Sequence, residues 1–202
     1  MIKPKIENVE SLVETQFVSL YDVKYRNKLD QEKSWTVASR KTKDELKSIY
    51  LDNNKGDVDA VVVVAFHEVE DKLVLIKQFR VPINDYIYEL PAGLVDKGEN
   101  VKTSIIRELK EETGLELTSI NEVMSRQKMY LSPGMTDESV ALVYCTCKGE
   151  ISKEYLEEDE DIEAILVSRE EASEILKGNE NVDIKAHLLL QQYVLLGDKL
   201  FK

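Results

Sequence analysis

The sequence contains few cysteine and histidine residues, two of each in 202. Cys145 and Cys147 lie two apart in a run that alternates like a strand, which points both side chains to the same face. This count excludes a disulfide framework, and a metal site would need more ligands. We expect both cysteines to pack as ordinary strand residues in a reducing compartment. His67 and His187 have no ligand-like spacing and are predicted to lie on the surface or in packing positions.

Long hydrophobic runs are also missing. The longest purely apolar run, AVVVVAF at 60–66, is too short to span a bilayer. The first ten residues, MIKPKIENVE, lack the apolar core of a signal peptide. We therefore expect a cytoplasmic protein that has no membrane partner.

Positive charge is scarce, because 27 Lys and Arg residues face 39 Asp and Glu residues, for a net charge of -12. Such a surface repels phosphate backbones, so a nucleic-acid partner is not expected. A small phosphorylated ligand remains compatible with this charge, since divalent cations in an acidic site supply the positive charge that the protein lacks.

The periodicity of the sequence predicts more strands than helices. A Ser168–Glu171 capping box and the glycines Gly114 and Gly197 mark expected helix ends. Helices are expected at 100–113, 169–176 and 183–196. Strands are expected at 13–25, 34–40, 58–66, 72–80, 86–93, 119–127, 139–147 and 162–168.

This order of elements favours an α/β protein in which helices sandwich a mixed sheet, an α/β/α arrangement. The polar cluster DNNKGD at 52–57 is a plausible boundary. The sequence thus predicts a small N-terminal antiparallel β-sheet within 1–52 and a main domain over 53–202.

One segment of the main domain concentrates acidic residues at helical spacing. Glu108, Glu111 and Glu112 lie at i, i+3 and i+4, which places them on one face of the predicted helix. Their mutual repulsion would destabilise an isolated helix. A bound Mg²⁺, which prefers oxygen ligands, would offset that repulsion, and Arg107 can hold a carboxylate in bidentate geometry. The alternative interpretation of RELKEE alone is a solvated Glu/Lys helix face.

The full spacing of residues 93–115 resembles the Nudix box, G-x5-E-x7-R-E-U-x-E-E-x-G-U, in which U is aliphatic. Each fixed position is filled, by Gly93, Glu99, Arg107, Glu108, Leu109, Glu111, Glu112, Gly114 and Leu115. The resemblance implies a hydrolase that depends on Mg²⁺, with Mn²⁺ as the alternative ion. It also implies a Nudix-type α/β/α sandwich as the fold of residues 53–202.

Shorter motifs are similar to those of the ADP-ribose pyrophosphatases within that family. They are SWTVASR at 34–40, KQFR at 77–80, ELPAG at 89–93, SPGMTDE at 132–138 and EEDEDIEAILVSREEA at 157–172. This resemblance implies hydrolysis of ADP-ribose to AMP and ribose 5-phosphate. Thr36 departs from the subgroup, which often has an acid beside the tryptophan, so bases other than adenine remain alternatives. Alternatives are other nucleoside diphosphate sugars, dinucleotides, or a nucleotide sensor without catalysis.

The resemblance implies roles for individual residues around the expected reaction centre. Glu158, Glu112, Glu111 and Arg107 form the predicted catalytic set, with Glu158 as the general base. Any other acid in 157–161 remains an alternative base. The alternative for the whole run is a disordered charged loop that has no catalytic role. Arg107 is expected to pair with Glu99 and to shape the loop before the helix. The predicted metal ligands are the Ala92 carbonyl, Glu108, Glu111, Glu112 and Glu160.

The same resemblance implies a substrate-binding group and an assembly. Trp35 is expected to stack on the base, Arg80 to clamp a phosphate and Glu138 to contact the terminal ribose. For Trp35 the alternative is a core or interface tryptophan, and for Arg80 a surface arginine at a strand end. The whole predicted group is Trp35, Arg40, Arg80, Ser132, Gly134 and Glu138. The N-terminal region pairs with its twin in the resembling enzymes, which implies a homodimer whose active sites borrow residues from the neighbour.

Overall fold

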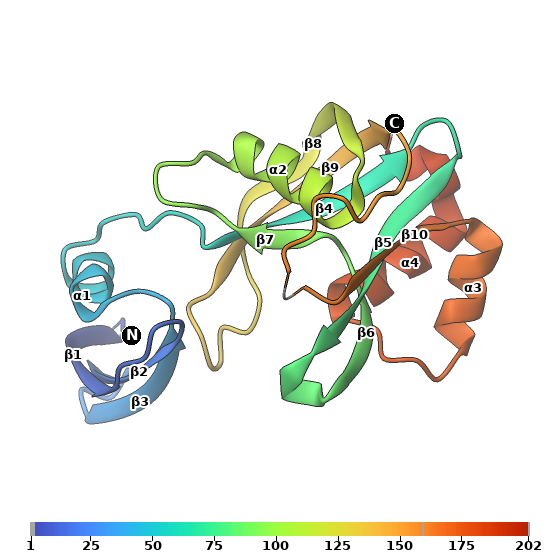
Figure 1. Cartoon of the computed structure of the whole chain (residues 1–202). Coiled ribbons are helices and arrows are strands. Elements are labelled where there is room, and N and C mark those ends of the chain that lie inside the picture. Colours follow the sequence, from blue (N-terminus) through green and yellow to red (C-terminus); the bar gives the residue numbers. More distant parts are fainter. Residues whose placement is uncertain (1–2, 159, 202) are drawn as a thin grey trace. The chain divides into compact units, whose positions relative to one another are not determined.

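A computed structural model of the chain describes residues 3–158 and 160–201 (Figure 1). The chain divides into two compact units. The first is Met1–Asp59 with Lys128–Val140, and the second is Ala60–Gln127 with Ala141–Lys202. Residues 53–59 and 128–140 thus belong with the N-terminal unit by their contacts. The domain boundary after residue 52 stays a prediction.

The first unit contains the small antiparallel sheet that the sequence predicts. Its order is β1 (Lys5–Val13), β2 (Ser19–Arg26) and β3 (Glu32–Ser39), with antiparallel pairing throughout. Helix α1 (Lys43–Leu51) packs against β1. The core between helix and sheet consists of Val9, Tyr21, Val23 and Leu46.

Two features of this unit differ from the sequence prediction. The strand expected at 13–25 is confirmed over residues 19–25 and wrong before them, because β1 ends at Val13 and β2 begins at Ser19. Between them the Thr15 hydroxyl donates to the Val18 carbonyl at 2.6 Å and accepts from the Val18 amide at 3.2 Å. A hydroxyl therefore makes this turn, and the segment has none of the Gly, Pro or Asn residues that usually mark one. Helix α1 was not predicted at all.

The larger of the two sheets has seven strands. Its main order is β10 (Ile162–Val167), β5 (Lys72–Arg80), β4 (Ala60–His67), β9 (Ser139–Lys148) and β8 (Glu116–Tyr130), while β6 (Asp85–Glu89) pairs with β5 and β7 (Ala92–Leu94) with β4. Strand β5 runs antiparallel to β10, β4 and β6. Strands β4 and β9 run parallel, because Asp59 bonds Ser139 at their starts and Glu68 bonds Cys147 at their ends. The sheet is mixed, as predicted.

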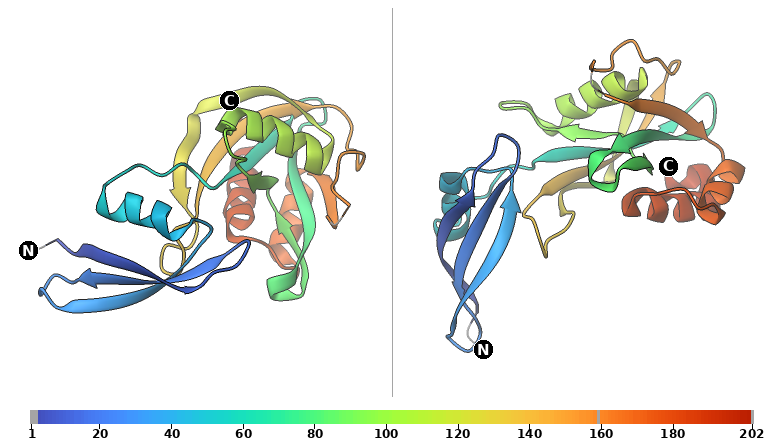
Figure 2. Two further views of the ribbon diagram at one scale, coloured as in Figure 1. Left: turned by 60° about the vertical axis from the view of Figure 1, so that its left-hand side comes forward. Right: turned by 60° about the horizontal axis from the view of Figure 1, so that its bottom comes forward.

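Helices lie on both faces of the second unit. Helix α2 (Val101–Thr113) packs against β4, β7 and β10, while α3 (Arg169–Lys177) and α4 (Ile184–Leu196) pack together on the other side of the sheet (Figures 1 and 2). Two 3-10 turns complete the elements, at Val81–Ile83 and Gly197–Leu200. All three helices predicted for this domain are confirmed, and so is the α/β/α layer arrangement.

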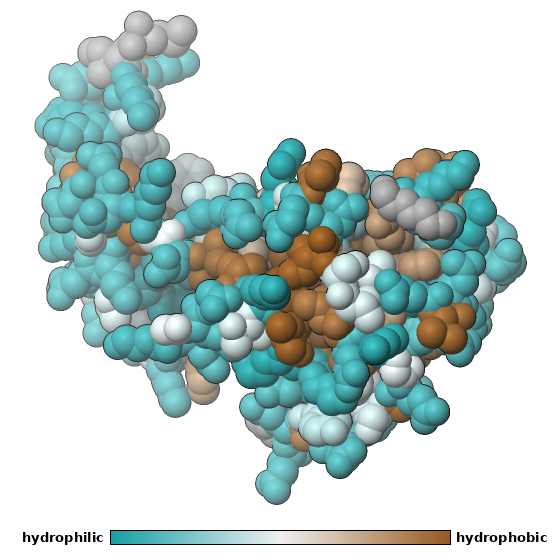
Figure 3. Space-filling model, turned by 90° about the horizontal axis from the view of Figure 1, so that it is seen from above, coloured by the Kyte–Doolittle hydropathy of each residue, from teal (hydrophilic) through white to brown (hydrophobic). Residues whose placement is uncertain are grey.

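Hydrophobic residues of β4 and β5 form the centre of this unit. Val61–Ala65 and Leu73–Ile76 are buried, and Cys145 and Cys147 are buried free thiols in β9. The surface is largely hydrophilic on the face shown in Figure 3, where hydrophobic residues gather in a central patch. Among residues 3–158 and 160–201, no helix has the length and apolar character that crossing a membrane requires. The cytoplasmic location stays a prediction.

Candidate active site

The carboxylate cluster forms where β7 meets α2. The helix begins after Asn100, whose side chain accepts from the Thr103 amide at 3.1 Å. It ends at Gly114, which has a φ of +77° that favours glycine. These two ends fix the helical register and turn Glu108 and Glu112 inward, with exposed fractions of 8% and 4%.

Strand β7 approaches the inner side of α2 very closely. The Ala92 amide donates to Oε2 of Glu112 at 2.9 Å, so this carboxylate is anchored to the strand. A Cβ atom on Gly93 would lie 1.9 Å from the Cδ atom of Glu108. A side chain at position 93 would therefore displace the Glu108 carboxylate from the space that it occupies.

Arg107 connects the loop before α2 to the helix. Its Nε and Nη2 atoms donate to the two oxygens of Glu99 at 3.2 and 2.9 Å. Nη2 also donates to the Leu94 carbonyl at 2.9 Å. Nη1 donates to Oε1 of Glu108 at 2.7 Å and to Oε2 of Glu111 at 3.0 Å. The bidentate pair with Glu99 holds the guanidinium plane in place, and that plane orients two carboxylates of the helix.

These contacts change the pKa of Glu99. Hydrogen bonds from Arg107 and then from Ser104 lower the pKa of Glu99 from 4.5 to about 2. The Ser104 hydroxyl lies 2.7 Å from Oε2 of Glu99. Glu99 therefore stays ionised at any physiological pH, and its charge keeps Arg107 in position.

The two inner carboxylates have the opposite tendency. Burial raises the pKa of Glu108 and, much more strongly, that of Glu112. The negative charge of Glu160, in the loop between β9 and β10, adds to both increases. The Ala92 amide and the positive charge of Arg80 act against the increase at Glu112. Negative charge accumulates here in a place where water screens it poorly.

The donor chemistry of this cluster suits a hard divalent cation. Two buried carboxylates repel each other and a third acid approaches them, and a cation would offset that repulsion. Within the described part of the chain, however, no three Asp, Glu, His or Cys side chains already converge as a metal site. Arg107 holds Glu108 and Glu111, and the Ala92 amide holds Glu112. A cation would have to compete with these contacts.

The acidic loop lies between β9 and β10. Glu158 is exposed. The Glu160 amide donates to the Glu157 carbonyl at 3.2 Å, and the Glu160 carboxylate accepts from the Glu157 amide at 3.3 Å. The side chain of Glu160 thus closes a local turn. Glu160 is the predicted loop residue with the clearer electrostatic link to the cluster.

Arg80 lies at the end of β5, and it brings in a residue that the sequence prediction missed. Its Nε atom donates to Oε2 of Glu89 at 2.6 Å, and the side chain of Glu89 is 14% exposed. Glu89 opens the ELPAG motif, so its position next to a motif already singled out was a usable signal. The pair fixes the Arg80 guanidinium near Glu112, where it can still contact an anion.

Comparison with known proteins places this geometry in a family. The family model described as "NUDIX domain" matches the sequence over residues 56–188. The chain belongs to the Nudix family.

Individual relatives of this Nudix chain carry related names. It is 32% identical to "Putative nudix hydrolase 2" of Caenorhabditis elegans, covering 80% of this chain and 71% of that protein. It is 35% identical to "ADP-ribose pyrophosphatase" of Bacillus subtilis, covering 65% and 70%. A solved structure titled "Crystal structure of ADP compounds hydrolase" superposes with a TM-score of 0.68 over 96% of both chains at 20% identity, which supports the fold. The predicted Nudix-type fold and family are confirmed.

The predicted substrate-binding residues other than Arg80 all lie in the first unit. Trp35 Nε1 donates to the Gly134 carbonyl at 3.3 Å, and Arg40 Nε donates to Glu138 at 2.9 Å. Ser132 accepts from the Met135 amide at 2.9 Å and closes the turn of the SPGMTDE loop. This loop lies along β3, and the structure brings all five predicted residues of the unit to that one edge.

A hollow of about 410 Å³ adjoins this edge. Trp35 lines it and is 54% exposed, so the ring is available to a flat ligand. The other lining residues are mainly apolar or aromatic, namely Pro4, Lys5, Ile6, Val23, Tyr25, Val37, Tyr50 and Pro133.

Lys41 is a second residue that sequence reasoning missed. Its Nζ atom contacts Asp59 and also Asp137 at 3.1 Å, with all three side chains nearly buried. Asp59 in turn accepts from the amide and hydroxyl of Ser139. This pairing holds the end of the SPGMTDE loop. The only signal for it in the sequence was Asp137, an acid within that motif.

Proposed function

We propose that the chain hydrolyses the diphosphate linkage of ADP-ribose to AMP and ribose 5-phosphate and requires Mg²⁺, with Mn²⁺ as a substitute. The observation that carries this proposal is the buried carboxylate cluster on α2, held by Arg107 and by β7. A full Nudix box forms that cluster. The relative named ADP-ribose pyrophosphatase in Bacillus subtilis supports the substrate.

The residues available to hold the cation are Glu108, Glu111, Glu112 and Glu160 together with the Ala92 carbonyl. When bound, a divalent cation neutralises diphosphate oxygens and lowers the pKa of coordinated water. Arg107 then has a positioning role, because it keeps the carboxylates of Glu108 and Glu111 on the same side of the helix.

The remaining steps fall to residues of the chain itself. Arg80 binds a phosphate oxygen through its planar guanidinium. Glu158 accepts the proton of the water that attacks phosphorus. The bridging P–O bond breaks as the new P–O bond forms, and two phosphate monoesters leave. Glu158 is exposed, so its role as the base depends on the loop approaching the substrate.

Substrate recognition is assigned to the edge of β3. The Trp35 ring offers a face on which a base can stack. Arg40 and Glu138 pair with each other and can contact the ribose groups. The apolar hollow beside Trp35 suits a ring system better than a phosphate.

We also propose a homodimer. The N-terminal sheet carries Trp35 and Arg40, and the carboxylate cluster belongs to the other unit. Pairing of two copies would let the N-terminal residues of one copy serve the cluster of its neighbour.

A panel of diphosphate compounds tests the proposed reaction. It should contain ADP-ribose, other nucleoside diphosphate sugars and dinucleotides, with Mg²⁺, with Mn²⁺ and with a chelator. We expect ADP-ribose to be cleaved fastest, with products of the masses of AMP and ribose 5-phosphate, and no cleavage with the chelator. A different preferred compound would reassign the substrate, and binding without cleavage of any compound would favour a nucleotide sensor.

The site assignment has its own test. We expect Glu112→Gln to reduce turnover by several orders of magnitude with the fold intact, because it removes a charge at the centre of the cluster. Glu122→Gln, which removes the same charge at an exposed position of β8, is the matched control and should keep the wild-type rate. A Glu112→Gln variant that retains near-wild-type turnover would refute the assignment.

A further inference from the structure

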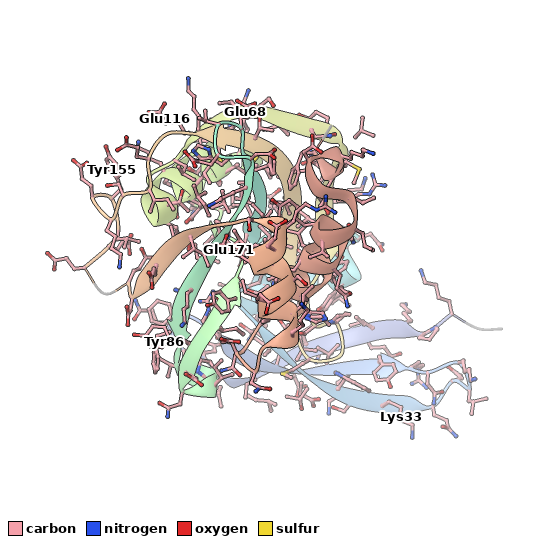
Figure 4. The ribbon with its side chains drawn as sticks, turned by 90° about the vertical axis from the view of Figure 1, so that its right-hand side faces the viewer. Lys33, Glu68, Tyr86, Glu116, Tyr155 and Glu171 are labelled. Atoms are coloured by element: carbon pink, nitrogen blue, oxygen red, sulfur yellow. The ribbon has the colours of Figure 1, made fainter. Side chains whose placement is uncertain are left out.

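The acidic loop between β9 and β10 contacts α2 near its start and the β5–β6 hairpin near its end. Its acids Glu157, Glu158 and Glu160 lie between two aromatic contacts, one through Tyr155 and one through Tyr86. Figure 4 shows Tyr86 on the β5–β6 hairpin and Tyr155 on the segment that leads from β9 to β10. Neither tyrosine belongs to the Nudix box or to the residues assigned above.

The contact at the end of the loop centres on Asp161. The Phe79 amide of β5 donates to the Asp161 carbonyl at 3.3 Å. The Tyr86 hydroxyl of β6 donates to the Asp161 carboxylate. The Tyr86 ring meets the ring of Phe79 edge-on, with centroids 5.5 Å apart. The backbone contact thus fixes where the loop joins the sheet, and the hydroxyl fixes the side chain that follows Glu160.

The contact at the start of the loop uses the helix that carries the cluster. The ammonium group of Lys110 lies 4.7 Å from the centroid of the Tyr155 ring, within the range of a cation–π interaction. Close by, the Ser152 amide donates to the carbonyl of Thr113, the last residue of α2, at 3.1 Å. Lys110 lies between Glu108 and Glu112 in sequence, so Tyr155 ties the loop to the same helix as the cluster.

Both rings remain substantially exposed, Tyr86 at 41% and Tyr155 at 44%. Rings of the hydrophobic core are far less accessible, so packing alone does not account for these two positions. Tyr86 contacts Asp161 through its hydroxyl and Tyr155 contacts Lys110 through its ring, and between these two contacts lies Glu160, whose charge reaches Glu108 and Glu112.

We propose that Tyr86 and Tyr155 are positioning residues that hold the acids of the loop beside the α2 carboxylates. Their effect on the loop does not depend on any particular reaction. Their effect on catalysis rests on the proposed function, since it requires Glu158 or Glu160 to act on the substrate.

The two contacts respond differently to the same substitution, which provides an internal control. Phenylalanine at position 86 removes the hydroxyl that Asp161 accepts from but keeps the ring against Phe79. Phenylalanine at position 155 keeps the ring face that Lys110 contacts. Tyr86→Phe should therefore release one end of the loop, while Tyr155→Phe should not. Tyr155→Leu removes the aromatic face and should release the other end.

The first measurement is amide hydrogen exchange of the peptide covering residues 149–161 in the full chain, without substrate. In Tyr86→Phe, the loss of a hydrogen bond to a carboxylate should speed amide exchange of this peptide roughly tenfold. Losing the cation–π contact should speed it roughly threefold in Tyr155→Leu. Tyr155→Phe should exchange like the wild type. Unchanged exchange in both Tyr86→Phe and Tyr155→Leu overturns the proposal.

The second measurement is steady-state kinetics on the diphosphate compound that the wild type cleaves best. Both releasing variants should lower kcat at least about twofold while KM changes less than about twofold, because the loop acts on the reaction rather than on ground-state binding. Faster exchange with unchanged kcat overturns the catalytic part of the proposal. If the wild type cleaves no compound, the proposed function fails, and the exchange data still decide whether the tyrosines hold the loop.

Discussion

Gly93 lacks a side chain at the point where the Glu108 carboxylate meets β7. A Cβ atom there would lie within 2.1 Å of all three carboxyl atoms of Glu108. We expect Gly93→Ala to displace Glu108 from Arg107 and to lower turnover at least about a hundredfold, because a displacement of about 1 Å in an active site has that effect. Steady-state kinetics and circular dichroism would check this. Lys102→Ala, on the exposed side of the same helix, is the control, and equal rates for both variants would contradict the steric argument.

Glu99 should make a measurable contribution to the pH dependence of stability. Its pKa is lowered in the folded chain to about 2, so its ionised form stabilises the fold above the ordinary value of 4.5. This contribution should be lost as the pH falls from about 4.5 towards about 2. Glu99→Gln should be less stable than the wild type at neutral pH and should lose less stability over that range. Urea unfolding at several pH values measures both curves, and parallel curves would contradict the assigned ion pair.

The capping box of α3 makes a prediction for a whole helix. The Ser168 hydroxyl accepts from the Glu171 amide at 3.2 Å, and the Ser168 amide donates to the Glu171 carboxylate at 2.7 Å. Replacing an N-cap serine by alanine typically costs about 1 kcal/mol. Ser168→Ala should therefore lower the free energy of unfolding by about that amount and leave kcat unchanged. Glu170→Ala, in the same turn but outside the box, should cost clearly less in the same urea titration.

The elements also show how far sequence patterns reach. The helix over 101–113 was predictable because Gly114 ends it and its apolar spacing is regular, and β4, β5 and β9 were predictable from their buried runs. The single strand expected at 86–93 is wrong, because the chain there forms two strands, β6 paired with β5 and β7 paired with β4. Helix α1 was missed although Thr42 and Glu45 form a capping box that could have been recognised. Its apolar face is weak, since Leu46 is its one residue described as buried, so periodicity gave little signal.

Pairing between distant residues lay beyond the sequence. The Nudix box predicted that Glu108 and Glu112 would share a face. It could not predict that Arg107 would hold Glu108 and Glu111 while a strand amide holds Glu112. The partner Lys41 of Asp137 comes from a distant segment brought to it by the fold, and a single sequence carries no measure of that proximity.

At the scale of the whole molecule, the predicted residues separate into two sets. Trp35 and Arg40 belong to the first unit, while Glu112 and Arg80 belong to the second. If two copies pair and exchange N-terminal residues, light scattering should give twice the chain mass of 23.2 kDa at concentrations where the enzyme is active. A monomer under those conditions would exclude the shared site.

Mixing two inactive variants tests the sharing itself. In a shared site, a copy with Trp35→Ala still offers an intact Glu112, and a copy with Glu112→Gln still offers an intact Trp35. Random exchange of equal amounts makes half of the dimers mixed, and each mixed dimer has one complete site, so activity should recover to about a quarter of the wild type. If each site uses residues of one chain only, every site in the mixture carries a substitution and nothing recovers. The recovered rate after subunit exchange therefore decides whether the N-terminal sheet serves its own carboxylate cluster or that of its neighbour.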